Sequence, residues 1–460
     1  MSGVCQVITG FSLLWAVAFV VQRLRRNARS RGLRLPPGPK RLPVIGNLLD
    51  LPQEQPWEEY HRMSQQYGDI MYLEALGQPI VVLDSLSRAT DLYDKRGATY
   101  SDRPYLPILD ISPSIQHGDE LEFWSDAVWY QMAPAPSSIS PTRKLKCTPQ
   151  VLPSLQYEEI VVLLRKLHQS PDDFLKHIQF FFGANIMRLS YGFDDVETNI
   201  SLIHDAEILM QAFSEAALPG RYLVNNLPFL KYIPAWFPGA GWKRKCQYIA
   251  SVNKRTLYNS FESVKESLRK GRRSAHPSMA FSLLDEMPEE NTPEREELES
   301  IARISCASGY AADADTTVSS AAAFFLVLAT HPDVQRKAQA EIDSVVGGSR
   351  LPLMSDRKSL PYLRAVIKEL GRWYTVVPLA EDSEYEGYFI PKGTLVMANT
   401  WAILHDPEVY PDPMAFKPER FLTADGKNLD PKVQDPYFSG AFGYGRRYAN
   451  PPLADRTLGI

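Results

Sequence analysis

Residues 304–330, "ISCASGYAADADTTVSSAAAFFLVLAT", constrain the fold of this chain more than any other stretch. The run contains no proline, and its small and apolar residues predict a helix that neighbouring elements must bury. Asp313, Asp315, Thr316 and Thr317 fall in its middle, where polar side chains are costly to bury without partners. Two interpretations stay open: a solvent-facing or back-bonded polar stripe, or a carboxylate and hydroxyl that deliver protons to a bound intermediate.

The rest of the chain predicts a mainly α fold with a minor β component. Residues 70–84 alternate like a hairpin, and short strand patterns return at "YEGYFI" and "TLVMAN". Helical patterns cover residues 157–167, 174–190, 202–217, 247–270, 296–330, 332–346 and 360–373. Residues 111–153 contain scattered proline and serine without a period, so we expect an irregular segment there.

Charge and cysteine content narrow the function classes. The formal net charge is −4 and no basic domain stands out beyond one short arm, which argues against a nucleic-acid partner. The four cysteines show no metal-ligand spacing, so we expect a reducing compartment and no disulfide framework. They are Cys5, Cys147, Cys246 and Cys306.

The first residues predict a membrane anchor. Residues 4–21 are uncharged and mostly apolar, close to the ~20 residues that a spanning helix needs. A cleaved secretory signal is the alternative, but such signals carry positive charge before the apolar run, and here the arginines follow it. The positive-inside rule then places the body in the cytosol, with the endoplasmic reticulum as the expected membrane. Residues 22–45 form a basic and proline-rich linker, and the folded domain covers 46–460.

Two charged patterns predict a network. Glu369 and Arg372 are spaced i, i+3 in "KELGRW" and can pair on one helix face. Such pairs are usually exposed and contribute little to stability. Arg420 in "AFKPERFL" could join them and produce a buried network.

The segment "AFGYGRRYANPP", residues 441–452, has the glycines and arginines of a loop that brings backbone close to a flat or charged ligand. A phosphate-binding loop is one interpretation, but the Lys-Ser/Thr that should follow is absent.

Together these motifs resemble the cytochrome P-450 superfamily of haem-thiolate monooxygenases, fungal microsomal type. The resemblance also covers "PPGP", "YGDIMYL", "AADADTT" and "GYFIPKGTLVMANTWAILHDPEVYPDPMAFKPERFL". It implies the cytochrome P-450 fold behind a single transmembrane helix, with haem b as cofactor. The implied partners are an NADPH-cytochrome reductase that donates electrons and a small apolar substrate, such as one of fungal secondary metabolism.

The resemblance also implies roles for individual residues. Asp315 and Thr316 match the acid–alcohol pair that delivers protons during catalysis. Phe442, Gly445 and Arg447 match the haem-binding loop. Glu369, Arg372 and Arg420 match the structural triad.

The sequence departs from the family pattern around the cofactor. The loop cysteine whose thiolate ligates the haem iron falls at position 449, where this chain has Ala449. Tyr448 could supply a phenolate only after a change of register. Asp313 replaces the glycine expected beside the oxygen site, and the family's last strands are missing after Ile460.

Two explanations stay open for these departures. The chain is either a haem-free relative that acts as a non-catalytic binding protein or pseudoenzyme, or the product of a gene model with misplaced splice junctions. Under the second explanation, the gene encodes an active monooxygenase, whereas a chain with this sequence is inactive.

Overall fold

The computed structural model describes residues 32–444, apart from several gaps. The gaps are 44, 98, 101–107, 109–147, 194, 218–220, 273–277, 289–291, 375–378, 381–383, 386–387, 392 and 442. The predicted anchor at 4–21 and part of the linker therefore lie outside the described residues. Among the described residues, no single helix is long and apolar enough to cross a membrane. The helical segments 317–330 and 332–346, which are bent by 104° against each other, are long and apolar enough only when they are taken together.

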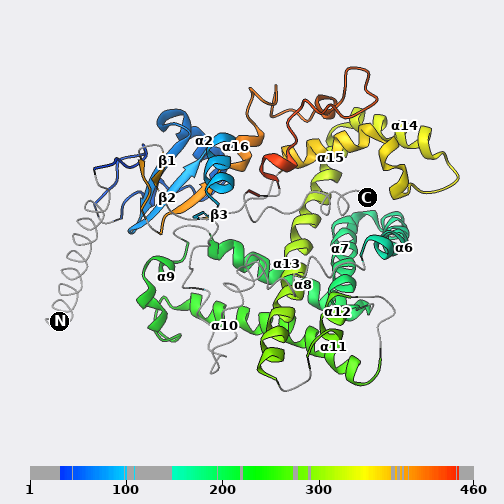
Figure 1. The fold of residues 1–460 in the computed structure, drawn as a ribbon, viewed down its shortest axis with the longest axis horizontal. Coiled ribbons are helices and arrows are strands. Elements are labelled where there is room, and N and C mark those ends of the chain that lie inside the picture. Colours follow the sequence, from blue (N-terminus) through cyan, green and yellow to red (C-terminus); the bar gives the residue numbers. More distant parts are fainter. Residues whose placement is uncertain are drawn as a thin grey trace.

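The fold is mainly helical with a small sheet, which confirms the predicted class (Figure 1). The helices are α2 (Pro56–Tyr67), α3 (Leu86–Ala89), α6 (Thr148–Gln169), α7 (Phe174–Tyr191), α8 (Val196–Ala217), α9 (Leu223–Asn226), α10 (Gly241–Lys254), α11 (Ser260–Arg269), α12 (Met279–Asp285), α13 (Pro293–Thr330), α14 (Pro332–Val346), α15 (Pro361–Trp373) and α16 (Thr400–Leu404). Shorter helical turns are η1 (Leu48–Asp50), η2 (Thr90–Lys95), η5 (Pro171–Asp173), η6 (Pro228–Tyr232), η7 (Arg255–Asn259), η8 (Met354–Ser359), η9 (Pro418–Phe421) and η10 (Tyr437–Ala441).

Strands from both halves of the chain build the main sheet. Its order is β1-β2-β6-β3, from β1 (Ile70–Ala75), β2 (Gln78–Leu83), β6 (Leu395–Ala398) and β3 (Leu379–Ala380). β2 runs parallel to β6, and the other pairs are antiparallel. A second small sheet pairs β4 (Glu384–Tyr385) with β5 (Tyr388–Phe389). The parallel pair joins residues more than 300 positions apart, so the sheet ties the start of the body to its end.

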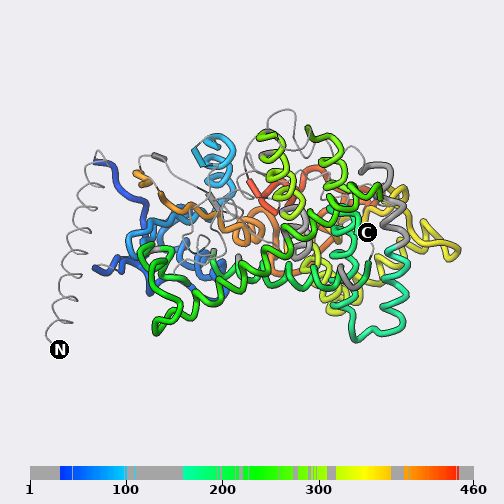
Figure 2. Tube along the Cα trace, turned by 90° about the horizontal axis from the view of Figure 1, so that it is seen from below, coloured from blue at the N-terminus to red at the C-terminus, as the bar shows by residue number. Residues whose placement is uncertain are grey.

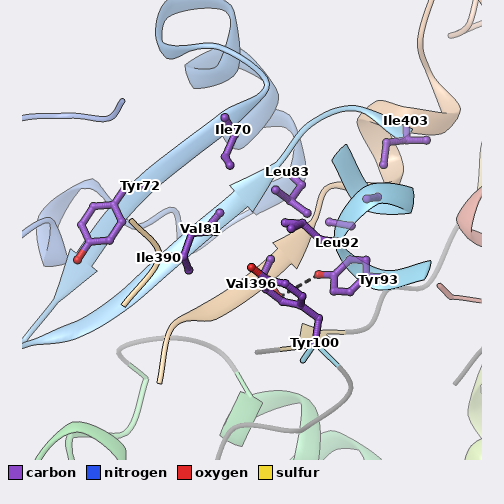
Figure 3. Packing of buried hydrophobic residues seen from close by; sticks show 12 residues of the cluster. Ile70, Tyr72, Val81, Leu83, Leu92, Tyr93, Tyr100, Ile390, Val396 and Ile403 are labelled. Atoms are coloured by element: carbon purple, nitrogen blue, oxygen red, sulfur yellow. Dashed lines mark hydrogen bonds between the residues drawn. The ribbon is translucent and has the colours of Figure 1, made fainter. Parts of the chain in front are cut away.

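Both faces of the sheet are buried. Successive side chains of a strand point in opposite directions, so the buried residues form two clusters, one on each face. One face places Ile70, Val81 and Val396 against η2 and α16 (Figure 3). The Tyr93 hydroxyl donates to the backbone oxygen of Val396 at 3.1 Å in this cluster. The other face buries residues that include Met71, Leu73 and Ile80 against α2.

Helix α13 runs through the helical part of the molecule (Figure 1). Its first half buries Ala302 and Cys306 in a cluster with α7, α8, α11 and α12. Its last turns bury Ala323 and Val327 against α14 and α15. The small residues noted in the sequence let neighbouring helices pack closely on it, which fits the prediction of a buried helix.

Some element boundaries differ from those predicted. α6 begins at Thr148, so the segment expected to be irregular ends before 153, and its residues 111–147 lie outside the described part. Pro149 stands in the first turn of α6, where its missing N–H leaves no bond unmade. The helix expected over 247–270 is confirmed, since α10, the π turn η7 and α11 follow one another without a break; its start lies earlier, at Gly241.

Candidate functional site

Helix α15 presents the two charged residues that the sequence paired. Glu369 and Arg372 both lie on its buried face and have no exposed surface. Arg372 Nε donates to Glu369 Oε2 and Arg372 Nη2 donates to Glu369 Oε1, each at 2.8 Å. This two-point geometry suits the planar guanidinium and fixes both side chains.

Arg420 completes a three-residue network. Its Nε lies 3.2 Å from the Glu369 carboxylate, and the backbone N–H of Lys417 donates to Glu369 Oε1 at 2.9 Å. The structure therefore brings together all three residues that the sequence placed in the triad. A carboxylate removed from water remains charged only when donors surround it in this way.

The same arginines hold the surrounding backbone. Arg372 Nη1 donates to the carbonyl of Leu404 at 3.0 Å, at the end of α16. Arg420 donates to the carbonyls of Pro411 and Asp412 at 2.8 and 3.2 Å. The network thus fastens residues 404–421 to α15. This segment precedes residues 441–452, which we call the glycine-rich loop.

An open groove lies on the outer side of this segment. It has a volume of about 850 Å³ between the start of α14, the end of α15 and residues 411–420. Phe416 forms part of its lining between His331 and Trp373, with ring centroids 5.5 and 6.0 Å away. Lys337 pairs with Glu419, and Lys417 pairs with Asp412, at its rim. The charges that line the groove are thus largely neutralised.

The start of the glycine-rich loop is described as far as Tyr444. The Tyr444 ring stacks on Tyr93, with centroids 5.5 Å apart, and its hydroxyl lies 3.2 Å from Thr400 Oγ1. Burial raises the pKa of this phenol. Gly440 lies beneath it with a φ of +123°, and a Cβ there would come within 2.1 Å of the Tyr444 oxygen. Tyr444 therefore fastens the start of the loop to η2 and α16.

No local sequence pattern assigns a role to Tyr93, Thr400 or Tyr444. Tyr444 stands inside the quoted loop motif, but Tyr93 and Thr400 are far away in the sequence and carry no local signal. A tyrosine between two loop glycines was the one feature that could have pointed to this contact.

The other predicted site residues are only partly described. Asp315 and Thr316 lie within α13, and the residue that follows them, Thr317, is buried. Phe442, Gly445, Arg447 and Ala449 lie outside the described residues. The roles assigned to all these residues remain predictions.

The thiols of the described part do not offer an alternative ligand. Cys306 is fully buried among apolar side chains of α7, α11 and α12, and this burial raises its pKa. Cys246 packs beside Val224 and Ile108, and its pKa is raised to about 11. Both thiols stay protonated near neutral pH, whereas the thiolate is the metal ligand. Within the described part of the chain, no group of three or more His, Cys, Asp or Glu side chains could hold a metal ion.

The donor set at the loop therefore does not fit a thiolate-ligated haem. Position 449 carries a methyl group, and no cysteine follows Cys306 anywhere in the chain. The contacts that hold the start of the loop are nevertheless present in the described residues. They are the Glu369–Arg372–Arg420 network and the packing of Tyr444 on Tyr93 and Thr400.

The sequence of this chain is similar to those of known proteins from a single family. The sequence model of the family described as Cytochrome P450 matches residues 36–448. The chain is 46% identical to Cytochrome P450 monooxygenase COX1 of Coprinopsis cinerea, over 97% of this chain and 86% of that protein. It is 41% identical to Cytochrome P450 monooxygenase COX2 of the same fungus, over 94% and 81%. It is 36% identical to Tryptamine 4-monooxygenase of Psilocybe cyanescens, over 95% and 85%.

The family match covers the sheet, α13, the buried network and the start of the glycine-rich loop, and it implies haem as cofactor. This chain therefore belongs to the cytochrome P450 family of monooxygenases.

Proposed function

We propose that the gene encodes a membrane-anchored P450 monooxygenase that oxidises a small apolar molecule of fungal secondary metabolism. The observation that carries this proposal is the family match over 36–448, together with the intact Glu369–Arg372–Arg420 network. Similarity to fungal monooxygenases, one of them named for tryptamine, supports a small-molecule substrate. The substrate itself stays unassigned.

The proposed cofactor is haem b, and the proposed electron donor is a separate NADPH-cytochrome reductase. Support for a separate donor comes from the sequence, which has no GxGxxG segment for a dinucleotide of its own. Phe442, Gly445 and Arg447 are the residues proposed to contact the haem, and Asp315 and Thr316 those proposed to deliver protons. The apolar run 4–21 and the arginines after it support attachment to the endoplasmic reticulum with the body in the cytosol.

Ala449 favours a second candidate for the chain as written. A member of this family without an axial cysteine retains the scaffold but has no thiolate for iron. Such a chain would act as a haem-free binding protein or pseudoenzyme.

The absorption spectrum separates these candidates. We expect the purified chain to show no thiolate-type Soret band after expression with added haem, and Ala449→Cys to gain one. A thiolate-type band from the unchanged chain would overturn the claim that Ala449 disables it. Failure of Ala449→Cys to bind haem, in a folded protein, would favour the binding-protein candidate.

Sequencing of the transcript tests the gene itself. The proposal of an active enzyme expects a messenger that restores a cysteine after Arg447. A transcript that encodes Ala449 in the same frame would support the pseudoenzyme instead.

A further inference from the structure

The groove between the start of α14, the end of α15 and residues 411–420 has the size of a small-molecule site. Its volume of about 850 Å³ falls in the range of ~300–1,000 Å³ that is usual for ligand pockets. In both views α14 lies at the end of the molecule opposite residues 32–50 (Figures 1 and 2). Attachment of the chain through residues 4–21 would therefore leave the groove open to water.

Three aromatic rings line one part of the groove, those of His331, Trp373 and Phe416. Phe416 is buried, and the Trp373 ring meets it edge to face at an angle of 89°. Trp373 itself is partly exposed, and its indole N–H donates to the carbonyl of Met414 at 3.1 Å, which fixes the ring. The faces of aromatic rings attract cations, and tryptophan does so most strongly.

The wall opposite these rings, residues 411–415, is ordered without a ligand. The guanidinium of Arg420 donates to the carbonyls of Pro411, Asp412 and Ala415 at 2.8, 3.2 and 3.3 Å. Asp412 has a φ of +50°, which is uncommon for a residue other than glycine, and these bonds hold it there. A wall that is already ordered loses little conformational freedom when a ligand binds.

Both lysines of the groove already have carboxylate partners. Lys337 Nζ lies 2.6 Å from the Glu419 carboxylate and 5.9 Å from the centre of the Tyr362 ring. Lys417 Nζ lies 2.5 Å from the Asp412 carboxylate. Each ammonium group is thus directed toward a carboxylate of its own.

Asp333 is the carboxylate that remains. It is exposed in the first turn of α14 and lines the groove. Within the part of the chain that the structure describes, it makes no hydrogen bond and no ion pair. The hydrogen bond with Glu419 raises the pKa of Lys337, and the charge of Asp333 adds to this effect, so the two carboxylates share one ammonium group.

The remaining charge of the lining is out of reach of a ligand. The side chain of Arg420 is only 9% exposed, and its donors are directed to Glu369 and the three carbonyls. The exposed rim therefore has three carboxylates and two ammonium groups, which belong to Asp333, Asp412, Glu419, Lys337 and Lys417.

These features distinguish between classes of ligand. An anion would meet the excess of carboxylates and the negative faces of the rings. A neutral apolar molecule would contact the rings but leave Asp333 without a partner. An organic cation satisfies both features, because a carboxylate and a ring face each attract positive charge.

We propose that this groove binds an organic ammonium cation, whose charged group pairs with Asp333 and whose apolar part lies against Trp373. This site goes beyond the proposed function. It does not depend on haem, because none of its residues belongs to α13 or to the glycine-rich loop.

Ligand-observed NMR on the full-length chain in a neutral detergent tests the charge. The probes are 2-phenylethylammonium and 2-phenylethanol, which carry the same ring with and without a positive charge. Asp333→Asn removes the carboxylate at nearly constant size. Asp343→Asn is the matched control, since Asp343 is exposed on the same helix but does not line the groove.

We expect the dissociation constant of the ammonium probe to rise about two- to five-fold in Asp333→Asn, the range for an exposed ion pair, and to stay unchanged in Asp343→Asn. The neutral probe should bind the unchanged chain more weakly and should not distinguish the variants. Equal affinity of the unchanged chain for both probes would overturn the proposal. So would equal affinity of the unchanged chain and Asp333→Asn for the ammonium probe.

The ring is tested with Trp373→Leu and Trp373→Phe. We expect the leucine variant to bind the ammonium probe more weakly than the phenylalanine variant, which keeps a less strongly attracting ring. Tyr374→Leu is the control, since Tyr374 is exposed beside Trp373 but does not line the groove. Circular dichroism checks that each variant is folded. Undiminished binding by folded Trp373→Leu would overturn the proposal.

Protein concentration separates a small ligand from a second copy of the chain. We expect the affinity for the ammonium probe to be independent of protein concentration. An affinity that falls as the concentration rises would show that another copy covers the groove, and would overturn the proposal. Neither result affects the test of the proposed function, because the Soret band is recorded without the probe.

Discussion

The carboxylate of Glu369 accepts hydrogen bonds from two nitrogens of Arg372 at 2.8 Å, and neither side chain is exposed to solvent. Arg420 approaches the same carboxylate from a segment that lies 48 or more residues further along the chain. The pair is therefore the point at which α15 is joined to the segment before the glycine-rich loop. Removal of Glu369 leaves both arginines without the carboxylate that they share.

Glu369→Gln should lower the free energy of unfolding by about 3–5 kcal/mol, because it leaves two arginines with no buried countercharge. The measurement is chemical denaturation followed by circular dichroism. Glu419→Gln is the control, since Glu419 pairs with Lys337 where both side chains are about half exposed. That change should cost less than about 1 kcal/mol. Equal effects of the two substitutions would show that burial does not strengthen the Glu369 pair.

Arg420→Lys should loosen the backbone of residues 411–417 without unfolding the protein. A lysine keeps the charge but cannot reach Glu369 and the carbonyls of Pro411 and Asp412 at once. Hydrogen exchange measured by mass spectrometry should be faster in this segment and unchanged in α13. Unchanged exchange at 411–417 would contradict the role of Arg420 as its fastening.

Gly440→Ala should destabilise the protein more than Gly426→Ala. Both glycines have positive φ, so alanine is strained at either position. Only at Gly440 would the new Cβ also meet the Tyr444 hydroxyl, at 2.1 Å, whereas nothing lies within 4 Å at Gly426. The difference in melting temperature between the two variants therefore reports the contacts of the new Cβ with Tyr444 and Thr400, together with the greater backbone strain at a φ of +123° than at +69°. Equal melting temperatures would show that the loop start moves aside freely.

His405 should make the protein less stable in acid. Burial lowers its pKa from 6.5 to about 4, and the charge of Arg372 contributes in the same direction. As pH falls, the unfolded chain takes up this proton near 6.5 and the folded chain only near 4, so stability is lost between these values. The melting temperature of His405→Gln should fall less steeply across that window. His204→Gln, at an exposed position, should follow the unchanged protein. A slope for His405→Gln as steep as that of the unchanged protein would contradict this assignment.

Helix content, the hairpin at 70–83 and the buried nature of α13 could be predicted from the sequence. Each depends on a local hydrophobic period or on the composition of one stretch of sequence. These local preferences agree with the tertiary structure, because the core buries the residues that the pattern makes apolar. The family resemblance and the absence of an axial cysteine were equally visible, since both depend on residue identity alone. The predicted irregular segment extends into α6 because prolines at 149 and 153 are typical of a loop, although α6 accommodates both, Pro149 in its first turn.

Tertiary structure alone decided which distant residues meet. Glu369 and Arg372 are ordinary surface partners by spacing, and their complete burial follows from the packing of residues 404–421 against α15. Tyr444, Tyr93 and Thr400 come together only because the sheet joins the two ends of the body. The exposure of Tyr232 and Trp236 is likewise decided by the tertiary structure, because nothing in the sequence around them indicates that no other element covers them. A sequence specifies the chemistry of each side chain, but burial depends on what the rest of the chain places over it.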